Sequence, residues 1–278
     1  MVSTEGVVET SLQGRVGIIR LVNEHGRNAM IQAWRDGMAA AVAQMVEDPD
    51  VRAIYLTGRG KAFCAGGDLS MMQRESDPWS AYQRLSGTNR WLMDLIRCPK
   101  PVVVGVNGVA VGGGVGIAIT GDVVYAAESA RFMSGFMRLG LMPDLGILHT
   151  LPRLVGMAKA KAFLLGNETW TAQQAEAAGL IAGVVPDAEL DARCMERAAA
   201  MAAGPIEALG MAKQILGRTY ETALDELLTY ESLGQPIAYA TQSMREGLAA
   251  LIEKREPDFV AASERELPTQ AARRRRGQ

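Results

Sequence analysis

The segment GKAFCAGGDL, at residues 60–69, decides how this sequence is best understood. It directly follows VRAIYLT at 51–57, an apolar and β-branched run that predicts a buried strand. Its glycine and alanine residues leave the backbone bare, so a ligand can lie directly against it. Because open α/β folds bind ligands at the carboxyl ends of their strands, we interpret the segment as a ligand-binding loop.

A second glycine-rich segment, NGVAVGGGVG at 107–116, follows the apolar run 102–106 and leads into a helix expected to begin near Gly112. Amides at the start of a helix lie at the positive end of its dipole. Two such loops can direct two N–H groups at one oxygen and stabilise its negative charge when a thioester becomes an enolate. Either loop alone could equally be a tight strand-to-helix turn, so the hypothesis depends on the pair.

The first half of the chain alternates strand and helix patterns. The predicted elements are strands at 15–22, 51–57, 102–106 and 123–126, and helices at 31–47 and after Asp77-Pro78. This alternation predicts an α/β fold with parallel strands and right-handed crossovers. After about residue 150 only 181–185 is strand-like, and short helices follow. One of them has a capping box, Thr171 with Gln174, and a stop at Gly179.

Three regions follow from these patterns. We predict an α/β core at residues 1–200 that carries the site, a helical region at 201–262, and a disordered tail at 263–278. The tail contains Arg273–Arg276, four consecutive arginines that keep RNA binding open as an alternative function. The formal net charge of the whole chain is -2, which gives no global reason to expect a nucleic-acid partner.

The composition is that of a folded globular protein: 278 residues, 48% hydrophobic and 22% charged. The three cysteines, Cys64, Cys98 and Cys194, are widely spaced and fit neither a disulfide framework nor a zinc cluster. We therefore expect a reducing cytoplasmic location and no metal site. The N-terminus lacks a signal-peptide pattern, and no stretch reaches the roughly 20 apolar residues that cross a bilayer, so neither secretion nor a membrane is expected.

The two glycine segments together resemble the crotonase superfamily of enoyl-CoA hydratases and isomerases. GKAFCAGGDL is followed some forty residues later by PVVVGVNGVAVGGG, and the match continues through SARF, RLGLMPDLG, LPRLVG, AEAAGLI and REGLAALIEKREPDF, over roughly residues 10 to 260. The resemblance implies a spiral of ββα units with a C-terminal helical trimerisation region, assembled as a homotrimer or hexamer. It also implies an acyl-CoA thioester substrate and no separate cofactor, since coenzyme A is part of the substrate.

The same resemblance assigns binding residues. Gly67 and Gly113 correspond to the residues whose backbone N–H groups hold the thioester oxygen, and the carbonyl of Ala65 corresponds to the one that meets the adenine of CoA. Asp68 and Leu69 complete that loop beside the substrate, although Asp68 is also expected to cap local backbone. The remaining CoA contacts implied are Arg27 with Asn28 near the phosphates, and Lys254 or Arg255 reaching CoA on a neighbouring subunit.

The match departs from the family at its two catalytic glutamates. Gly116 and Phe136 stand at those positions, and neither side chain can move a proton. The nearest acid is Asp144, a position that is aspartate in members resembling the isomerase of phenylacetate degradation and the nucleophile in members resembling 4-chlorobenzoyl-CoA dehalogenase. The surrounding motifs resemble the former. A pocket of Phe136, Met137 and Leu141 is expected to raise the pKa of Asp144, which suits an isomerase base.

Several alternatives remain open at this point. Asp144 could simply cap the helix that follows Pro143, in which case Glu75, Asp77 or His149 would be the acid. The chain could also be a hydratase, or a dehalogenase-like enzyme in which Asp144 activates water or attacks the acyl group. From a different class comes a CoA-binding or RNA-binding protein without catalysis.

Overall fold

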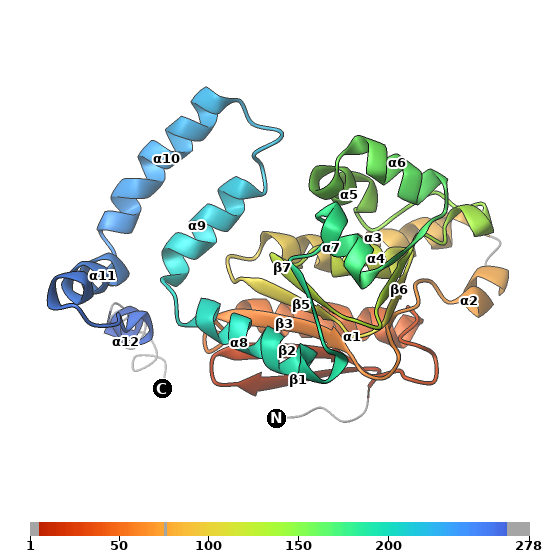
Figure 1. The fold of residues 1–278 in the computed structure, drawn as a ribbon, viewed down its shortest axis with the longest axis horizontal. Helices are drawn as coiled ribbons and strands as arrows, with labels where there is room; N and C mark the ends of the chain where they lie inside the picture. Colours follow the sequence, from red (N-terminus) through yellow and green to blue (C-terminus); the bar gives the residue numbers. More distant parts are fainter. Residues whose placement is uncertain (1–5, 75–76, 266–278) are drawn as a thin grey trace.

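The computed structural model describes residues 6–74 and 77–265, folded as two sheets with surrounding helices (Figure 1). The larger sheet has the order β1-β2-β3-β5-β7-β10. Its strands are β1 (Val8–Gln13), β2 (Val16–Leu21), β3 (Ala53–Gly58), β5 (Val102–Val106), β7 (Val123–Ala127) and β10 (Gly183–Val185). Only β1 and β2 pair antiparallel in this sheet, and the other neighbours are parallel. The predicted α/β fold with parallel crossovers is therefore confirmed.

Helices connect many of the strands and continue alone after β10. They are α1 (Gln32–Glu47), α2 (Leu69–Arg74), α3 (Pro78–Arg97), α4 (Gly113–Ala118), α5 (Ile147–Val155), α6 (Met157–Leu165), α7 (Ala172–Ala178), α8 (Leu190–Ala202), α9 (Ile206–Leu216), α10 (Leu224–Tyr239), α11 (Gln242–Glu253) and α12 (Phe259–Arg265). Two predicted start signals are confirmed. Asp77 accepts hydrogen bonds from the Trp79 and Ser80 amides at the start of α3, and Thr171 and Gln174 form the capping box of α7.

The structure also contains a smaller, four-stranded sheet that was not predicted from the sequence. Its order is β4-β6-β8-β9, and the strands are β4 (Ala62–Cys64), β6 (Val109–Val111), β8 (Arg131–Met133) and β9 (Thr169–Thr171). Strands of three residues are too short to show an alternating pattern, which explains the omission. Two of them lie inside the glycine-rich segments that were predicted as loops. Each glycine segment therefore contains a strand that fixes its direction.

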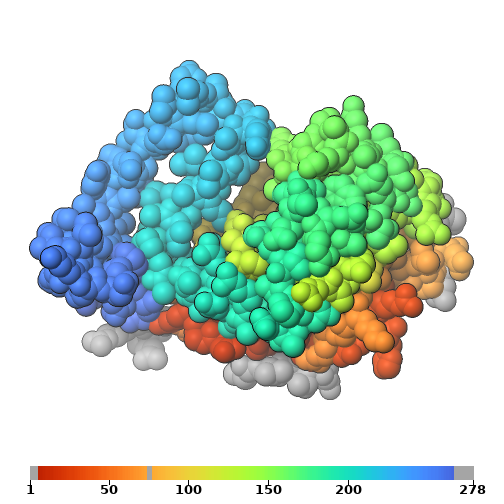
Figure 2. Space-filling model, viewed as in Figure 1, coloured from red at the N-terminus to blue at the C-terminus, as the bar shows by residue number. Residues whose placement is uncertain are grey.

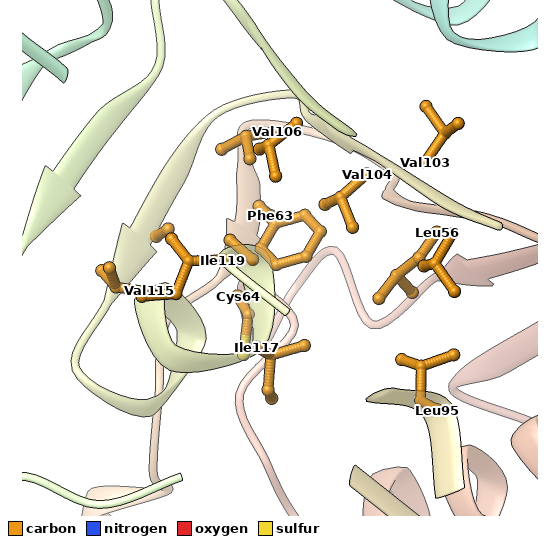
Figure 3. Packing of buried hydrophobic residues seen from close by; sticks show 14 of the residues in the cluster. Leu56, Phe63, Cys64, Leu95, Val103, Val104, Val106, Val115, Ile117 and Ile119 are labelled. Atoms are coloured by element: carbon orange, nitrogen blue, oxygen red, sulfur yellow. The ribbon is translucent and has the colours of Figure 1, made fainter. Parts of the chain in front are cut away.

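One part of the hydrophobic core lies where α4 packs over the first glycine segment. Val115 and Ile117 of α4 lie close to Cys64 and Phe63, and buried valines of β5 belong to the same cluster (Figure 3). Ile117 and Phe63 are fully buried. This packing joins the two glycine segments through apolar contacts before any ligand is considered.

The C-terminal helices differ from the prediction at two boundaries. Helix α8 crosses residue 200, and α12 extends to Arg265, so residues 263–265 are helical rather than part of a tail. Arg52 connects this region to the core: it donates to the carbonyls of Ala202 and Gly204 and to the hydroxyl of Ser263. Beyond α9, helices α10 and α11 project away from the body (Figures 1 and 2). Among the described residues, no helix is both long and apolar enough to cross a membrane.

Candidate active site

The two glycine segments are in direct contact, and glycine is required where they meet. A β-carbon on Gly114 would lie 2.3 Å from the carbonyl oxygen of Cys64. One on Gly66, whose φ is +83°, would lie 2.7 Å from the carbonyl oxygen of Val111. Both distances are too short for a real contact, so larger residues would push the segments apart. The sequence predicted two converging loops, and these contacts bring their backbones together.

The amides of Gly67 and Gly113 make no hydrogen bond within the described residues. Beside Gly67, the amide of Met30 donates to the carbonyl of Gly66 at 2.9 Å. Gly113 is the first residue of α4, where the amide has no acceptor within the helix. Within the described part of the chain, neither amide donates a hydrogen bond to another residue.

Met30 links the two glycine segments into one site. Its Cε lies 2.8 Å from the position of a β-carbon on Gly113, and Met30 also lines a small cavity of about 10 Å³ beside Gly67. The other residues lining that cavity are Arg35, Asp68, Met71, Met72 and Arg84. The Cε of Met72 lies 2.3 Å from a β-carbon position on Gly67, so this side chain fills the space beside the amide. A ligand that approaches Gly67 must therefore displace a flexible methionine.

Asp144 faces this site from the segment that precedes α5. Its Oδ1 lies 3.3 Å from the position of a β-carbon on Gly113, is buried, and has no hydrogen-bond partner among the described residues. Burial raises the pKa of Asp144, while the positive charges of Arg35 and, less strongly, Arg84 lower it. The cap of α5 is Gly146 with no side-chain hydrogen bond, so the alternative in which Asp144 caps this helix is wrong.

The environment of Asp144 differs from the one predicted. Phe136 is buried beside Gly112, 3.5 Å from the position of a β-carbon there, but Met137 and Leu141 are 38% and 42% exposed. None of these three lines the cavity beside Gly67. The predicted rise in the pKa of Asp144 is confirmed in direction, yet the apolar groups near Gly113 are Met30 and Leu145.

The absence of a glutamate at position 116 has a structural counterpart. A β-carbon on Gly116 would lie 2.8 Å from the carbonyl oxygen of Leu145 and 3.2 Å from its Cβ. Leu145 itself has a φ of 50°, in the left-handed region that leucine seldom adopts. The backbone that carries Asp144 therefore occupies the space that a longer side chain at position 116 would need.

The residues expected to contact CoA lie in two separate regions: the segments of Arg27 and Ala65, which contact each other, and the end of α11. Ala65 donates from its amide to the carbonyl of Arg27 at 3.0 Å, and the buried Asn28 donates to the carbonyl of Ala62 at 2.8 Å. The Arg27 segment is thus attached to the first glycine segment, with the Arg27 side chain exposed; Leu69 is exposed as well. Lys254 ends α11, which lies at the opposite end of the molecule from α2 (Figure 1). Arg255, beside it, pairs with Glu246 and Glu253.

The other acids and nucleophiles have structural surroundings. The carboxylate of Asp68 accepts hydrogen bonds from the amide and hydroxyl of Ser70 and so caps α2, as expected. Asp77 is exposed, and hydrogen bonds from Ser80 hold its pKa below the usual value. Burial raises the pKa of the Cys64 thiol to about 12, so it stays protonated. His149 is half exposed, 3.5 Å from Glu221. Glu75 and Arg273–Arg276 lie outside the described residues.

Two functional candidates were not predicted from the sequence. Arg35 of α1 and Arg84 of α3 line the cavity beside Gly67 and both act on the pKa of Asp144. Each occurs in an amphipathic helix, where a charged residue ordinarily marks the solvated face. Nothing in the local sequence distinguishes these two arginines from exposed ones.

The chain is similar to many known proteins and solved structures. The family model for Enoyl-CoA hydratase/isomerase matches residues 11–262. The 1,2-epoxyphenylacetyl-CoA isomerase of Escherichia coli (strain K12) is 38% identical over 84% of this chain and 92% of its own length. The mitochondrial enoyl-CoA hydratase of Pongo abelii is 33% identical over 88% and 83%. The crystal structure of an enoyl-CoA hydratase from Polaromonas sp. JS666 superposes with a TM-score of 0.87 at 29% identity, covering 91% of this chain and 99% of that one.

Proposed function

Since this chain belongs to the enoyl-CoA hydratase/isomerase family, which acts on CoA thioesters, we propose that it is an enoyl-CoA isomerase with Asp144 as its acid and base. The observation that carries the proposal is the position of the Asp144 carboxylate, 3.3 Å from a β-carbon position on Gly113. A carboxylate so close to the proposed oxyanion site can reach the carbons next to the thioester.

The proposed reaction moves one proton. The thioester oxygen accepts hydrogen bonds from the amides of Gly67 and Gly113, and Asp144 removes a proton from the carbon α or γ to the carbonyl. The electron pair moves onto the oxygen and gives an enolate. Asp144 then returns the proton to the other carbon, so the double bond shifts and the carboxylate is regenerated. The substrate and product are isomers, so the reaction needs no further reactant.

Hydration is the second candidate, because several similar proteins carry the name enoyl-CoA hydratase. It would use Asp144 to activate a water molecule that adds to the β carbon, and the enolate so formed would have to be protonated at the α carbon by the same group or by solvent. The crowding at Gly116 leaves no room for a second carboxylate from α4. We therefore favour isomerisation, and the name of the Escherichia coli relative extends the candidate substrates to an aromatic epoxide on CoA.

Product analysis tests the proposal. Purified enzyme is incubated with 2-enoyl-CoA, 3-enoyl-CoA and 1,2-epoxyphenylacetyl-CoA, products are separated by chromatography and their masses are measured, with Asp144→Asn as the control for contaminating activity. The proposal expects a new chromatographic peak with the mass of the substrate from at least one of the three. A product that is heavier by one water, formed from 2-enoyl-CoA alone, would establish the hydratase instead.

We also propose that the chain works as a homotrimer or hexamer. Helix α10 has sixteen residues and none of them is buried. Its exposed apolar side chains include Leu224, Leu228, Leu233 and Ile237. A helix of this kind gains little stability in water on its own, and a closed symmetric assembly would bury such surfaces.

Replacing Leu233 and Ile237 together by glutamate should dissociate this assembly. Each of these side chains is about 60% exposed in the single chain, so the double variant should retain the fold of the core while charges occupy the apolar contact. Sedimentation velocity should show a species near the size of one chain. Gln235→Glu is the matched control, since it adds charge to the same helix at an exposed polar position. Native protein that sediments as a monomer at micromolar concentration would contradict the assembly.

A further inference from the structure

Arg35 lines the small cavity beside Gly67, although it belongs to a helix that contains none of the motifs associated with catalysis. It belongs to α1 and donates from Nη1 to the hydroxyl of Thr88 on α3 at 2.7 Å. That hydroxyl in turn donates to the carbonyl of Arg84 at 3.1 Å, and Thr88 is only 1% exposed. A buried hydroxyl thus fixes the position of the guanidinium. Rigid support of this kind is what a preorganised site requires.

Arg35 and Arg84 stand between two cavities. Both line the small cavity beside Gly67, and both also line a larger one of about 380 Å³ between α1 and α3. Arg90 of α3 lines only the larger cavity. The two arginines therefore separate the neighbourhood of the proposed oxyanion site from an open, polar groove. The charges of Arg35 and Arg84 lie at the inner wall of this groove, where solvent screens them less than it screens charges at the open side of the groove.

We propose that Arg35 is a positioning residue for the reaction, holding a fixed positive charge at the wall shared with Gly67 so that Asp144 stays ionised and ready to accept a proton. The proposal rests on the proposed role of Asp144 as the base. Asp144 needs such help because its Oδ1 is buried without a hydrogen-bond partner among the described residues. Burial without an opposing positive charge would favour the protonated carboxyl, which cannot act as a base.

The electrostatic effects on Asp144 agree with this role. Burial is the largest effect and raises the pKa of Asp144; the charge of Arg35 is the first effect that opposes it, ahead of that of Arg84. Among the described residues, the other groups near Asp144 are neutral or have partners of their own. Helix α4 carries no titratable side chain, and Cys64 beside it remains a neutral thiol with its pKa raised to about 12 by burial. On α5, His149 and Arg153 pair with Glu221, and Asp68 caps α2.

Loss of the Arg35 charge should shift the pH dependence of activity in one direction. Removing the positive charge of Arg35 raises the pKa of Asp144 further, so a smaller fraction is ionised at any acidic pH. Because the reaction needs the ionised form, the acidic limb of the pH profile should move to higher pH. Asp144 is less affected well above its pKa, so the loss of activity should be greatest at low pH.

The test compares pH profiles of kcat/KM for Arg35→Met, Arg35→Lys and Arg90→Met. We expect the acidic limb of Arg35→Met to move to higher pH, with a loss of kcat/KM at the acidic end of the profile at least tenfold greater than at its alkaline end. Arg35→Lys should restore most of the native limb because it keeps the charge. Arg90→Met should match the native profile, since Arg90 lies outside the small cavity. A uniform loss at every pH in Arg35→Met would overturn the proposal.

Thr88→Val and Asp144→Asn distinguish a failure of the Arg35 proposal from a failure of the proposed function. Thr88→Val removes the anchor of Arg35 but keeps its charge, so it should give a smaller shift of the limb in the same direction, even if Arg35→Met were to fold poorly. An unshifted Thr88→Val profile together with an unshifted Arg35→Met profile would end the proposal. Asp144→Asn reports on the proposed function itself: if it is inactive while the arginine variants show no shift, only the role of Arg35 fails. If Asp144→Asn is active, both ideas fail.

Discussion

Replacing Asp144 by asparagine is expected to lower turnover by about 10²- to 10⁴-fold, the range usual for the loss of a general acid or base. The asparagine keeps the shape of the side chain but cannot accept the proton. The affinity for acyl-CoA should change little, because the proposed amide contacts from Gly67 and Gly113 do not involve this side chain. Steady-state kinetics on the best substrate of the product panel measures the first effect, and acyl-CoA binding by calorimetry measures the second.

The folding stability of Asp144→Asn distinguishes a catalytic role of Asp144 from a structural one. The folded state raises the pKa of Asp144 through burial, so its contribution to stability is full below the unfolded pKa and is lost as the pH rises through the folded pKa. Near neutral pH the ionised carboxylate therefore costs stability, and Asp144→Asn should melt at the same temperature as the native protein or higher. A variant that unfolds early would show that Asp144 has a structural role, and one that retains full turnover would show that Asp144 is not the base.

The second large effect is expected at Gly114. A β-carbon at this position would lie 2.3 Å from the carbonyl oxygen of Cys64, which is backbone and cannot rotate away. Gly114→Ala should lower the free energy of unfolding by about 3 kcal/mol, at the upper end of the usual cost of overpacking. For a chain of this size that corresponds to a fall in the melting temperature of roughly 6–12 °C. Thermal unfolding followed by circular dichroism gives the measurement.

Gly87→Ala is the matched control for this substitution. Gly87 lies within α3, and a β-carbon there would meet no atom within 4 Å. Alanine in a helix interior is favoured over glycine by about 1 kcal/mol, so this variant should melt at the native temperature or slightly above it. If both variants melt alike, the contact between the two glycine segments does not have the rigidity assigned to it.

The parts of the fold that could be predicted are those with local signals. The Asp77 cap and the capping box of Thr171 and Gln174 depend on residues three positions apart, and both occur as predicted. The strands β4 and β6 could not be predicted, because three residues carry no periodicity and their pairing depends on segments some fifty positions apart.

The candidate site divides in the same way. Gly67, Gly113 and Asp144 were predicted from the motifs that contain them, and their roles in catalysis stay predictions. Arg35 was not, because its approach to the site depends on how α1 packs against α3, which sequence spacing does not report. Met137 and Leu141 were predicted to lie around Asp144, but both are partly exposed and neither lines the cavity beside Gly67; apolar character in the sequence does not determine which way a side chain faces in the fold.

The contact between Gly116 and Leu145 limits how this site could be redesigned. The carbonyl oxygen of Leu145 lies 2.8 Å from where a β-carbon at position 116 would be, so even alanine there requires the backbone to move. A single substitution that introduces a glutamate at position 116 should therefore displace the segment that carries Asp144 rather than simply add a second carboxylate. Substitutions at positions 116 and 145 should not act independently, so a two-carboxylate design has to rebuild both positions together.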